Sequence, residues 1–429
     1  MILLSTIIEE FEELFFDKYE NIILPSHRKA LWAMKICRTK FSPQMLASCS
    51  NDDCSNRMCL PHSCGHRSCP HCQNYESWRW IENQLTKQLP VQYNFITFTL
   101  PKQLRQIAWE NQKLVYTLFF LCVKEVLSTF TKNDKKLQGI AGFTMVMHTN
   151  SRTLGYHPHI HVIMPRACIN RDTKSWCEKK SKYLFNHRAL AIVFRAMLLK
   201  KMIDNGLQIP RACPKKWIIF CKNVGGGDKA LIYLGKYLYK GVIQEKDILK
   251  SENGMVTFRY LNSKTKKYLT RTVKGEYFLW LLMQHVLPKG FHRARDYGLL
   301  HHRSKELIKL LQYLLKCNPH KEINHTKERA KIICHQCGYK MKIILTMIPY
   351  TKFWQLRSYF TKTSLIRQGV IWFSCNSLIL WGRENLWILV LSLSKYHNRT
   401  IAFKNMLKWS ILCPESYFQP WINRNYLIW

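Results

Sequence analysis

Acidic side chains are scarce in this sequence of 429 residues. Aspartate and glutamate together number 27, whereas lysine and arginine number 66, and the formal net charge is +39. An excess of this size is larger than solubility requires. It indicates a polyanionic partner held through phosphate contacts, most simply nucleic acid, with an anionic membrane surface as the alternative.

A secretory leader and long apolar runs are also missing. The opening residues "MILLSTIIEEFEELFFDKYENII" lack a basic head and carry acids among the apolar residues, which is typical of an amphipathic helix. After about residue 350 the chain is rich in Trp and Leu. The two uncharged runs there are each shorter than the about 20 residues that a membrane span needs. We therefore expect no membrane partner and a cytoplasmic, reducing location.

Internal repeats are absent too, so the sequence gives no sign of a repeat array. Hydrophobic residues make up 47% of the chain, which favours a globular protein over a disordered one. The length allows two or three domains. From residue 93 the pattern is α+β: strands at 93–101, 139–148 and 156–165, a long helix at 102–130, and a tyrosine-bearing helix at 228–241.

Three histidines alternate in the predicted strand "YHPHIHVIMP", residues 156–165. Side chains alternate between the two faces of a strand, so His157, His159 and His161 share one face. Neighbours two apart are about 6.6 Å apart at Cα and can converge on one ion, which predicts His159 and His161 as the chelating pair. His148 and His157 are the candidates for the third ligand, and we expect His148 to lie near His157. The alternative is a set of histidines satisfied without a metal.

Two tyrosines in "LIYLGKYLYK" are four residues apart. On a helix, Tyr233 and Tyr237 would therefore lie on one face, with the shallow Gly235 between them. A phenol is a poor nucleophile alone, but it becomes useful when a metal polarises the phosphate that it attacks. Ordinary core packing is the alternative for such a pair. The histidine strand would supply the metal and the tyrosine helix the nucleophile, so each completes the other.

The chain has 17 cysteines, and they are densest between Cys49 and Cys72. This segment is polar and has few residues that could form a core, so we expect it to need a metal to fold. The spacing of the cysteines suits a structural four-thiolate zinc site. The predicted zinc ligands are Cys49, Cys54, Cys69 and Cys72, with Cys64, Cys59 and His66 as substitutes. A second C-x-x-C pair, Cys334 and Cys337, has no obvious partner pair nearby, and Cys317 and His335 are weak candidates for it.

Basic residues near these motifs are candidates for DNA contacts. They are Lys236, Lys240, Arg293 and Arg295. The two arginines would grip a phosphate in a fork, or else form a solvated loop. A basic helix expected at 171–201 mixes lysine and arginine with Trp176, Tyr183 and Phe185, as in a single-stranded DNA channel. The alternative is an amphipathic helix whose aromatic residues pack inward.

Together these motifs resemble the HUH transposases with two tyrosines of the insertion sequence ninety-one group, which move by a rolling-circle mechanism. The resemblance covers about residues 25–345. It rests on four blocks in the order of the family: "SCGHRSCPHCQ", "HTNSRTLGYHPHIHVIMP", "YLGKY" and "HVLPKGFHRARDYGLL". The tail beyond about 350 lies outside it.

The resemblance implies an HUH endonuclease core, an antiparallel sheet flanked by helices, with a small N-terminal zinc-binding domain. It implies Mg²⁺ or Mn²⁺ at His159 and His161, and Tyr233 and Tyr237 as nucleophiles that cut one strand of prokaryotic, nucleoid DNA and retain its 5′ end. The oligomeric state stays open. The expected segments are 1–88 (N-terminal helix and zinc-binding DNA-recognition domain), 89–315 (nuclease), 316–349 (C-x-x-C extension) and 350–429 (apolar tail without an assigned role).

Two other functions fit the same motifs. One is a zinc-dependent DNA-binding protein whose nuclease site is inactive, and the other is an HUH replication initiator or relaxase. The cysteine segment and the "HVLPKGF" block favour the transposase.

Overall fold

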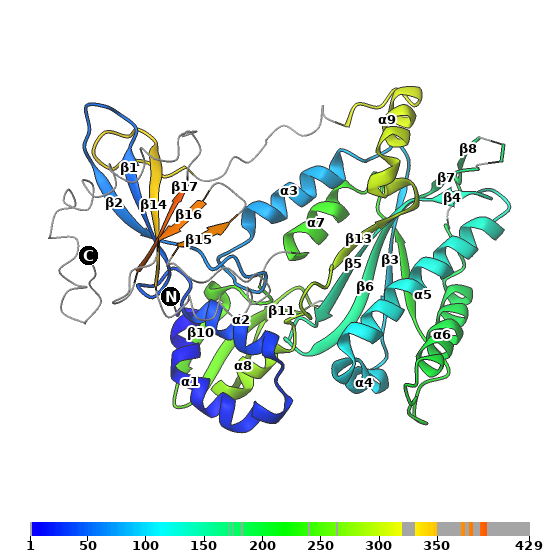
Figure 1. Ribbon diagram of the computed structural model, residues 1–429. Helices are drawn as coiled ribbons and strands as arrows, with labels where there is room; N and C mark the ends of the chain where they lie inside the picture. The colour runs from blue at the N-terminus through cyan, green and yellow to red at the C-terminus, as the bar shows by residue number, and fades with distance from the viewer. Residues whose placement is uncertain are drawn as a thin grey trace. The chain divides into compact units, whose positions relative to one another are not determined.

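The structure is a computed structural model. It describes residues 2–319 and 331–349 apart from 171, 174, 182, 239–240 and 263–264, together with the backbone of strands at 370–373, 377–380 and 387–392. Expectations for the other residues, including most of the tail, lie outside the described part. Figure 1 shows the elements and their labels.

The chain divides into two compact units, each built from two separate stretches. The first unit comprises Met1–Lys35 and Gly65–Lys327, and the second comprises Ile36–Cys64 and Glu328–Trp429. This division differs from the predicted segments 1–88, 89–315, 316–349 and 350–429. Strands Gln44–Cys49 and Met341–Pro349, from the first and third of those segments, pair in one sheet. Such long-range pairing cannot be predicted from the order of residues along the chain.

A five-stranded antiparallel sheet forms the centre of the first unit, in the order β13-β5-β6-β3-β9. Its strands are β3 (Tyr93–Thr99), β5 (Phe143–Asn150), β6 (Tyr156–Pro165), β9 (Ile219–Asn223) and β13 (Ala294–Tyr297). β5 and β6 are buried along nearly their whole length, because helices cover both faces of the sheet. Their side chains therefore divide between two separate cores.

Different helices cover the two faces of this sheet (Figure 1). One face packs on α5 (Gln112–Asn133) and α6 (His187–Asp204), where Ile160 and Val162 join a large apolar core. Between β3 and α5 lie η2 (Lys102–Leu104) and α4 (Arg105–Glu110). The other face packs on α7 (Asp228–Leu238) and α3 (Asn74–Leu85), where Val146 and Ile163 meet Leu231 and Leu234. His159 and His161 alternate with Ile160 and Val162, so they face α7.

A second subassembly of the first unit joins the start of the chain to its later part. Here α1 (Leu4–Tyr19) packs on α8 (Gly275–Met283), and the rings of Tyr19 and Trp280 stack with centroids 4.8 Å apart. The other elements are α2 (Pro25–Lys35), β10 (Ile248–Glu252), β11 (Met255–Leu261) and β12 (Tyr268–Lys274). The predicted N-terminal helix is thus present as α1, and its buried face includes Ile7, Ile8 and Phe11.

The remaining elements of the first unit lie at its edges. A small sheet has the order β4-β7-β8, with β4 (Ile140–Ala141), β7 (Ala167–Ile169) and β8 (Trp176–Glu178). The helix α9 (Lys305–Leu314) follows β13 through two short 3-10 turns (Gly298–Leu300, His302–Ser304), and two others lie at Glu20–Ile22 and Glu245–Asp247.

The second unit contains one sheet in the order β15-β16-β17-β14-β1-β2. Its strands are β1 (Gln44–Cys49), β2 (Arg57–Pro61), β14 (Met341–Pro349), β15 (Val370–Phe373), β16 (Ser377–Leu380) and β17 (Trp387–Ser392). β1 and β14 run antiparallel, with Cys49 opposite Met341.

The predicted α+β class, with an antiparallel sheet flanked by helices, is confirmed, but the basic helix expected at 171–201 is not. In that range α6 begins only at His187, after Asn186 caps its first N–H groups, while Trp176 lies in β8. Phe185 is buried in the core and Tyr183 is exposed. The aromatic residues therefore do not form one stacking face on a helix.

Among the described residues, α5 is the one helix long and apolar enough to cross a membrane. Its buried side chains, among them Tyr116, Phe119 and Phe120, belong to the core beneath the central sheet.

Candidate functional site

Three histidines converge on the face of the central sheet that α7 covers. In the register of the strands His148 stands directly opposite His159, and Val146 opposite His161. The ring of His148 is 5.4 Å from that of His159 and 4.7 Å from that of His161, between centroids. One nitrogen from each ring lies within 4.8 Å of the other two. The predicted pair is thereby joined by His148.

Hydrogen bonds orient the two β6 imidazoles. Nδ1 of His159 donates to the carbonyl of His157 at 2.7 Å, and Nδ1 of His161 lies 3.0 Å from the hydroxyl of Thr97. The first bond leaves Nε2 of His159 available as a ligand, and Nε2 of His161 is available when Nδ1 donates to Thr97. Nε2 of His148 is buried and has no hydrogen-bond partner within the described chain. A buried nitrogen in that position fits a divalent metal as its partner.

The electrostatics of the three rings keep them neutral. Burial lowers the pKa of His148 and His161 well below the ordinary histidine value, and the adjacent imidazoles lower both pKa values further. Burial also lowers the pKa of His159. A neutral imidazole has a lone pair for a metal, whereas the protonated form has none. The site is therefore prepared for a cation at neutral pH.

His157 lies on the same strand but has another partner. Nη2 of Arg105, at the start of α4, donates to its Nδ1. That bond uses the lone pair on Nδ1 and places a positive charge beside the ring, which disfavours metal binding. The expected proximity of His148 to His157 is also corrected. A bulge after His148 shifts the register, so that His148 meets His159 and β6 includes His157.

The two predicted tyrosines project from α7 toward the histidines. Tyr233 is 43% exposed and Tyr237 is 54% exposed, and their ring centroids are 4.8 Å apart. The ring of Tyr237 is 6.3 Å from that of His148. The ring of Tyr233 is 6.5 Å from that of Phe95, which itself lies 4.8 Å from the ring of His161. Three imidazoles and two phenols therefore share one surface.

Gly235 has a different role from the one expected. Instead of forming a shallow surface between the tyrosines, it faces α3, where an added Cβ would lie 2.1 Å from a side-chain carbon of Ile81. Ser77 also donates its hydroxyl to the Gly235 carbonyl at 2.5 Å. The absence of a side chain lets α3 approach α7 closely, and the opposite face of α7 then presents the tyrosines to the histidines.

The environment of Tyr233 opposes ionisation. Burial raises the pKa of its phenol, and the nearby phenol of Tyr237 adds to the increase. Arg152, in the loop between β5 and β6, lowers the same pKa. This arginine is exposed and donates to the Leu261 carbonyl at 3.0 Å, so it adds positive charge next to the phenol.

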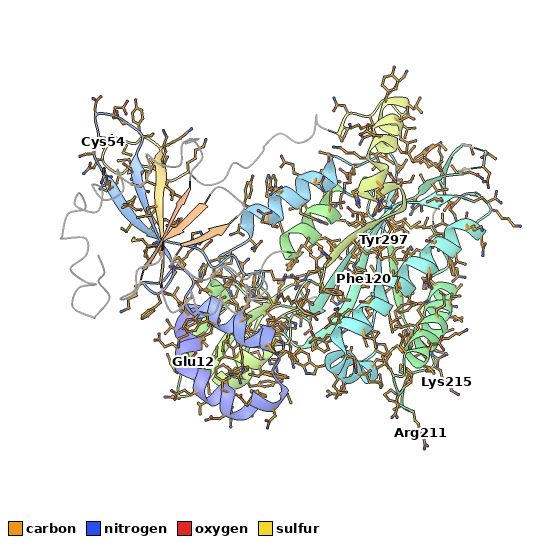
Figure 2. All side chains as sticks on the ribbon, in the orientation of Figure 1. Glu12, Cys54, Phe120, Arg211, Lys215 and Tyr297 are labelled. Atoms are coloured by element: carbon orange, nitrogen blue, oxygen red, sulfur yellow. The ribbon has the colours of Figure 1, made fainter. Side chains whose placement is uncertain are left out.

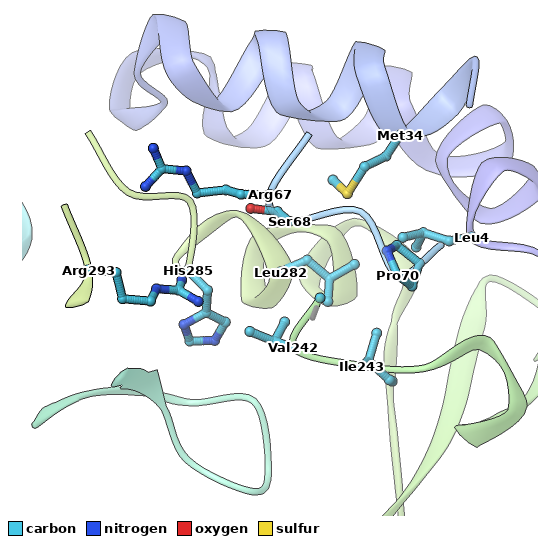
Figure 3. A pocket seen from close by; sticks show the side chains of 11 residues that line it. Leu4, Met34, Arg67, Ser68, Pro70, Val242, Ile243, Leu282, His285 and Arg293 are labelled. Carbon is cyan, nitrogen blue, oxygen red and sulfur yellow. The ribbon is translucent and has the colours of Figure 1, made fainter. Parts of the chain in front are cut away.

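Residues of the predicted block 285–300 form hydrogen bonds to the β5–β6 loop region and to the end of α7. His285 lies in contact with both ends of the β5–β6 loop, because Nδ1 is 3.2 Å from the Thr149 hydroxyl and Nε2 donates to the Leu154 carbonyl at 2.9 Å. Arg293 donates to the carbonyl of Leu238, the last residue of α7, at 3.0 Å. Figure 3 shows His285 and Arg293 next to each other at a cavity of about 10 Å³, room for one water molecule.

The basic residues predicted to contact DNA differ in their contacts and exposure. The guanidinium of Arg295 lies 4.2 Å from the centre of the Phe120 ring, a residue labelled in Figure 2. Arg293 is bonded to the end of α7, so both arginines contribute to the fold, and a phosphate contact by either stays a prediction. Lys236 is exposed on α7. Lys240 lies outside the described residues.

The four predicted zinc ligands do not form one group. Cys49 and Cys54 lie in the second unit, where their sulfurs are within 4.8 Å of those of Cys334 and Cys337. Cys69 and Cys72 are buried residues of the first unit. Proximity in the chain favours one group of four, whereas the pairing of β1 with β14 gives Cys49 and Cys54 other partners. Of the substitutes, Cys59 is exposed on β2, while Cys64 and His66 are half-buried.

Sequence reasoning missed several residues of the histidine site. Thr97 is hydrogen-bonded to His161, Arg105 donates a hydrogen bond to His157, and Arg152 acts electrostatically on Tyr233. Only Thr97 gave a readable signal, because it alternates with apolar residues in the predicted strand 93–101 and so shares a face with the histidines across β6.

Two family models match the chain. One, described as "Putative transposase", covers residues 142–307, which include every histidine and tyrosine of the site. The other, described as "Transposase zinc-binding domain", covers residues 7–100.

Named relatives agree with these matches. A protein of Sinorhizobium fredii, y4qJ, with the same description as the first model, is 31% identical over 306 residues, which are 66% of this chain and 76% of that protein. The transposase for insertion sequence element IS801 of Pseudomonas savastanoi pv. phaseolicola is 25% identical over 251 residues, 54% of this chain and 60% of its own.

Among solved structures, TrwC complexed with a 27-mer DNA comprising a recognition hairpin and the cleavage site is 12% identical. It covers 52% of this chain and 74% of its own, with a TM-score of 0.22. The α+β fold is evident from the central sheet and its helices.

Proposed function

Because the chain belongs to the two-tyrosine transposases of the insertion sequence ninety-one group, which carry a zinc-binding domain, we propose that it moves DNA by a rolling-circle mechanism. In this proposal it cuts and rejoins single strands, using Tyr233 and Tyr237 as nucleophiles. One observation carries the proposal: the tyrosines of α7 lie over the sheet face that holds His148, His159 and His161, with the Tyr237 and His148 rings 6.3 Å apart.

The three histidines would hold a divalent cation, Mg²⁺ or Mn²⁺. When bound, such a cation draws charge from the scissile phosphate and makes its phosphorus a better electrophile. The contribution of the protein is to keep the imidazoles neutral by burial, to fix the His159 tautomer through the His157 carbonyl and to orient the His161 ring through Thr97. The preformed arrangement avoids reorganisation during the reaction.

The phenol oxygen of one tyrosine attacks the phosphorus, and the bond from phosphorus to the 3′ oxygen breaks. The tyrosine proton passes to solvent, the departing 3′ oxygen takes a proton from solvent, and the 5′ phosphate stays linked to the protein. Since burial raises the pKa of Tyr233, this phenol is protonated at neutral pH before the attack. The charge of Arg152 partly offsets that effect.

Two neighbouring phenols allow two cuts without release of the first strand. The rings are 4.8 Å apart on one helical face and both are exposed, so either hydroxyl has access to a phosphate near the histidines. While the first tyrosine holds the donor 5′ end, the second is available to cut the target. Reversal of the first step by a new 3′ hydroxyl would then join the strands.

The DNA partner is proposed to be single-stranded at the cleavage point. The excess of basic residues, with a net charge of +39, supports phosphate contacts in general. Exposed Arg152 and Lys236 are the basic side chains that we assign to the strand beside the tyrosines. The site of action would be DNA of the nucleoid, in the cytoplasm.

The chain belongs to a family with a zinc-binding domain, and its cysteine content supports structural zinc. We assign Cys69 and Cys72 to the zinc of that domain, with Cys64 as their nearest cysteine in the chain. This assignment keeps the C-x-x-C pair that the sequence predicts as zinc ligands and leaves Cys49 and Cys54 to other partners.

The alternative of a DNA-binding protein with an inactive nuclease site predicts binding without cutting. The intact set of histidines and tyrosines favours the enzyme, because a decayed site has no need to keep three adjacent imidazoles, two of them buried, beside two exposed phenols. A replication initiator or relaxase would share the cutting step, and the transposase family matches favour transposition over it.

The test incubates the full chain with single-stranded DNA from an element end and Mg²⁺ or Mn²⁺, and follows a covalent protein–DNA adduct on denaturing gels. The wild type is expected to form the adduct, and the Tyr233→Phe/Tyr237→Phe variant to form none. Tyr313→Phe is the matched control, since this tyrosine is exposed on α9. Equal adduct from the double variant and the wild type would refute the assignment.

A further inference from the structure

The second unit brings together four cysteines, two from each of its two stretches of chain. The Sγ atoms of Cys49 and Cys337 are 3.3 Å apart, and those of Cys54 and Cys334 are 3.8 Å apart. Both distances exceed the about 2.05 Å of a disulfide bond. A tetrahedral zinc ion with zinc–sulfur bonds of about 2.3 Å separates its sulfurs by about 3.8 Å. The spacing therefore fits a shared ion better than an oxidised pair.

The backbone around the C-terminal pair forms a tight turn. The N–H of Gly338 donates to the Cys334 carbonyl at 2.9 Å, and the N–H of Cys334 donates to the Tyr339 carbonyl at 2.8 Å. Gly338 has a φ of 74°, which glycine adopts without strain. This turn directs both thiols of "CHQCG" to the same point.

The loop between β1 and β2 presents the other two thiols. The N–H of Cys54 donates to the Asn51 carbonyl at 3.1 Å, and the N–H of Asn51 donates to the Cys49 sulfur at 3.4 Å. Asn56 donates its side-chain N–H to the Cys334 sulfur at 3.1 Å. Amide N–H groups that point at sulfur stabilise thiolates, which are the form that binds metal. Figure 2 labels Cys54 in this loop.

The apolar core around these cysteines is small. In this cluster only Ala47, Cys334 and Met341 are buried among the described residues. A cluster of this size supplies little hydrophobic stabilisation, and small domains of that kind depend on a metal or another cross-link. The same cluster surrounds the thiols with partly buried side chains such as Met58 and Ile332.

We propose that Cys49, Cys54, Cys334 and Cys337 bind one structural Zn²⁺ ion that closes the second unit. Four thiolates leave no open position, so the ion has no catalytic role. Two of its ligands lie outside the matched zinc-binding region, which ends at residue 100. The ion would connect parts of the chain separated by 288 positions, and it is distinct from the zinc assigned to Cys69 and Cys72.

Metal analysis of the full chain by mass spectrometry tests the proposal. We expect Cys49→Ser/Cys54→Ser and Cys334→Ser/Cys337→Ser each to lose one zinc per chain relative to the wild type. The quadruple variant is expected to lose no more than either double variant, because the four residues share one ion. Cys213→Ser is the control, a half-buried cysteine of the first unit that should keep the wild-type zinc content.

A conservative variant separates ligand loss from misfolding. Cys337→His replaces one zinc ligand by another, so it should retain the zinc that the Cys337→Ser variant loses. With Co²⁺ in place of zinc, the visible absorption bands should shift in Cys337→His because one thiolate becomes an imidazole. Unchanged zinc in Cys334→Ser/Cys337→Ser, additive losses in the quadruple variant, or iron in place of zinc would each overturn the proposal.

Discussion

The two groups of candidate metal ligands are assembled differently. The histidine site takes its three imidazoles from adjacent strands of one hairpin, and helix α7 of the same unit brings the tyrosines. The four-cysteine group takes two ligands from each of two segments 280 to 288 positions apart. The first site is held by a large core on both faces of a sheet, whereas the second has a cluster with three buried members. A metal in the first would serve chemistry, and a metal in the second would serve folding.

The largest effect should come from the histidine site. We expect His159→Ala/His161→Ala to reduce strand cutting at least about a thousand-fold, since loss of the cation removes several kcal/mol of transition-state stabilisation. The measurement is the rate of cutting of a labelled single strand. His157→Ala is the matched control, because Arg105 already occupies this ring, and it should lose less than about ten-fold. Similar losses in both variants would show that the three-histidine assignment is wrong.

Chelators should have different effects on the histidine site and on the four-cysteine group. Brief treatment with EDTA should stop cutting while the circular dichroism spectrum stays unchanged, and added Mn²⁺ should restore activity. The reason is that the histidines lie on a sheet with an apolar core on each face. A stronger zinc chelator should instead increase cleavage by protease in the second unit, whose small core depends on its metal. Protease sensitivity that rises equally in both treatments would contradict this difference.

A substitution that disturbs the close packing of α3 on α7 should have a smaller effect, on stability. Gly235→Ala should destabilise the fold by about 1–3 kcal/mol, since the new methyl group would meet Ile81. The thermal unfolding midpoint should fall by several degrees. Gly226→Ala is the control: its added carbon would have only ordinary contact with Asp228, at 3.8 Å. An equal midpoint for Gly235→Ala and the wild type would mean that α7 has room to move.

The smallest effect concerns His27 of α2, whose ring stacks on that of Trp109. Burial lowers the pKa of its ring to about 4, below the about 6.5 of an unfolded histidine. The unfolded chain therefore takes up this proton first, and stability falls as the pH decreases from 6.5 toward 4. His27→Gln should weaken that fall by about 1 kcal/mol between pH 6 and pH 5, measured by urea unfolding. Parallel curves for variant and wild type would contradict the buried neutral state.

Much of the histidine site could be predicted from the sequence because its geometry is local. Alternation along a strand places His159 and His161 on one face, and helical spacing places Tyr233 and Tyr237 on one face. The third ligand needed the register of the hairpin, which depends on a bulge after His148 that has no clear signature in the sequence. The role of Gly235 needed the position of α3.

The four-cysteine group could not be predicted in the same way. Nothing in the spacing of Cys334 and Cys337 names Cys49 and Cys54 as their neighbours, since only the pairing of β1 with β14 brings them together. The predicted helix 171–201 failed for a related reason. Its residues Trp176–Glu178 form β8 and pair with β7, so tertiary contacts override a basic, amphipathic pattern there.

The central claim is that Tyr233 and Tyr237 attack DNA from beside the three histidines. The most direct measurement digests the covalent protein–DNA complex and identifies the DNA-linked residue by tandem mass spectrometry. We predict a nucleotide remnant on Tyr233 or Tyr237, attached through a 5′ phosphate. A remnant on any other residue, or cut DNA without any protein-linked remnant, would contradict the claim.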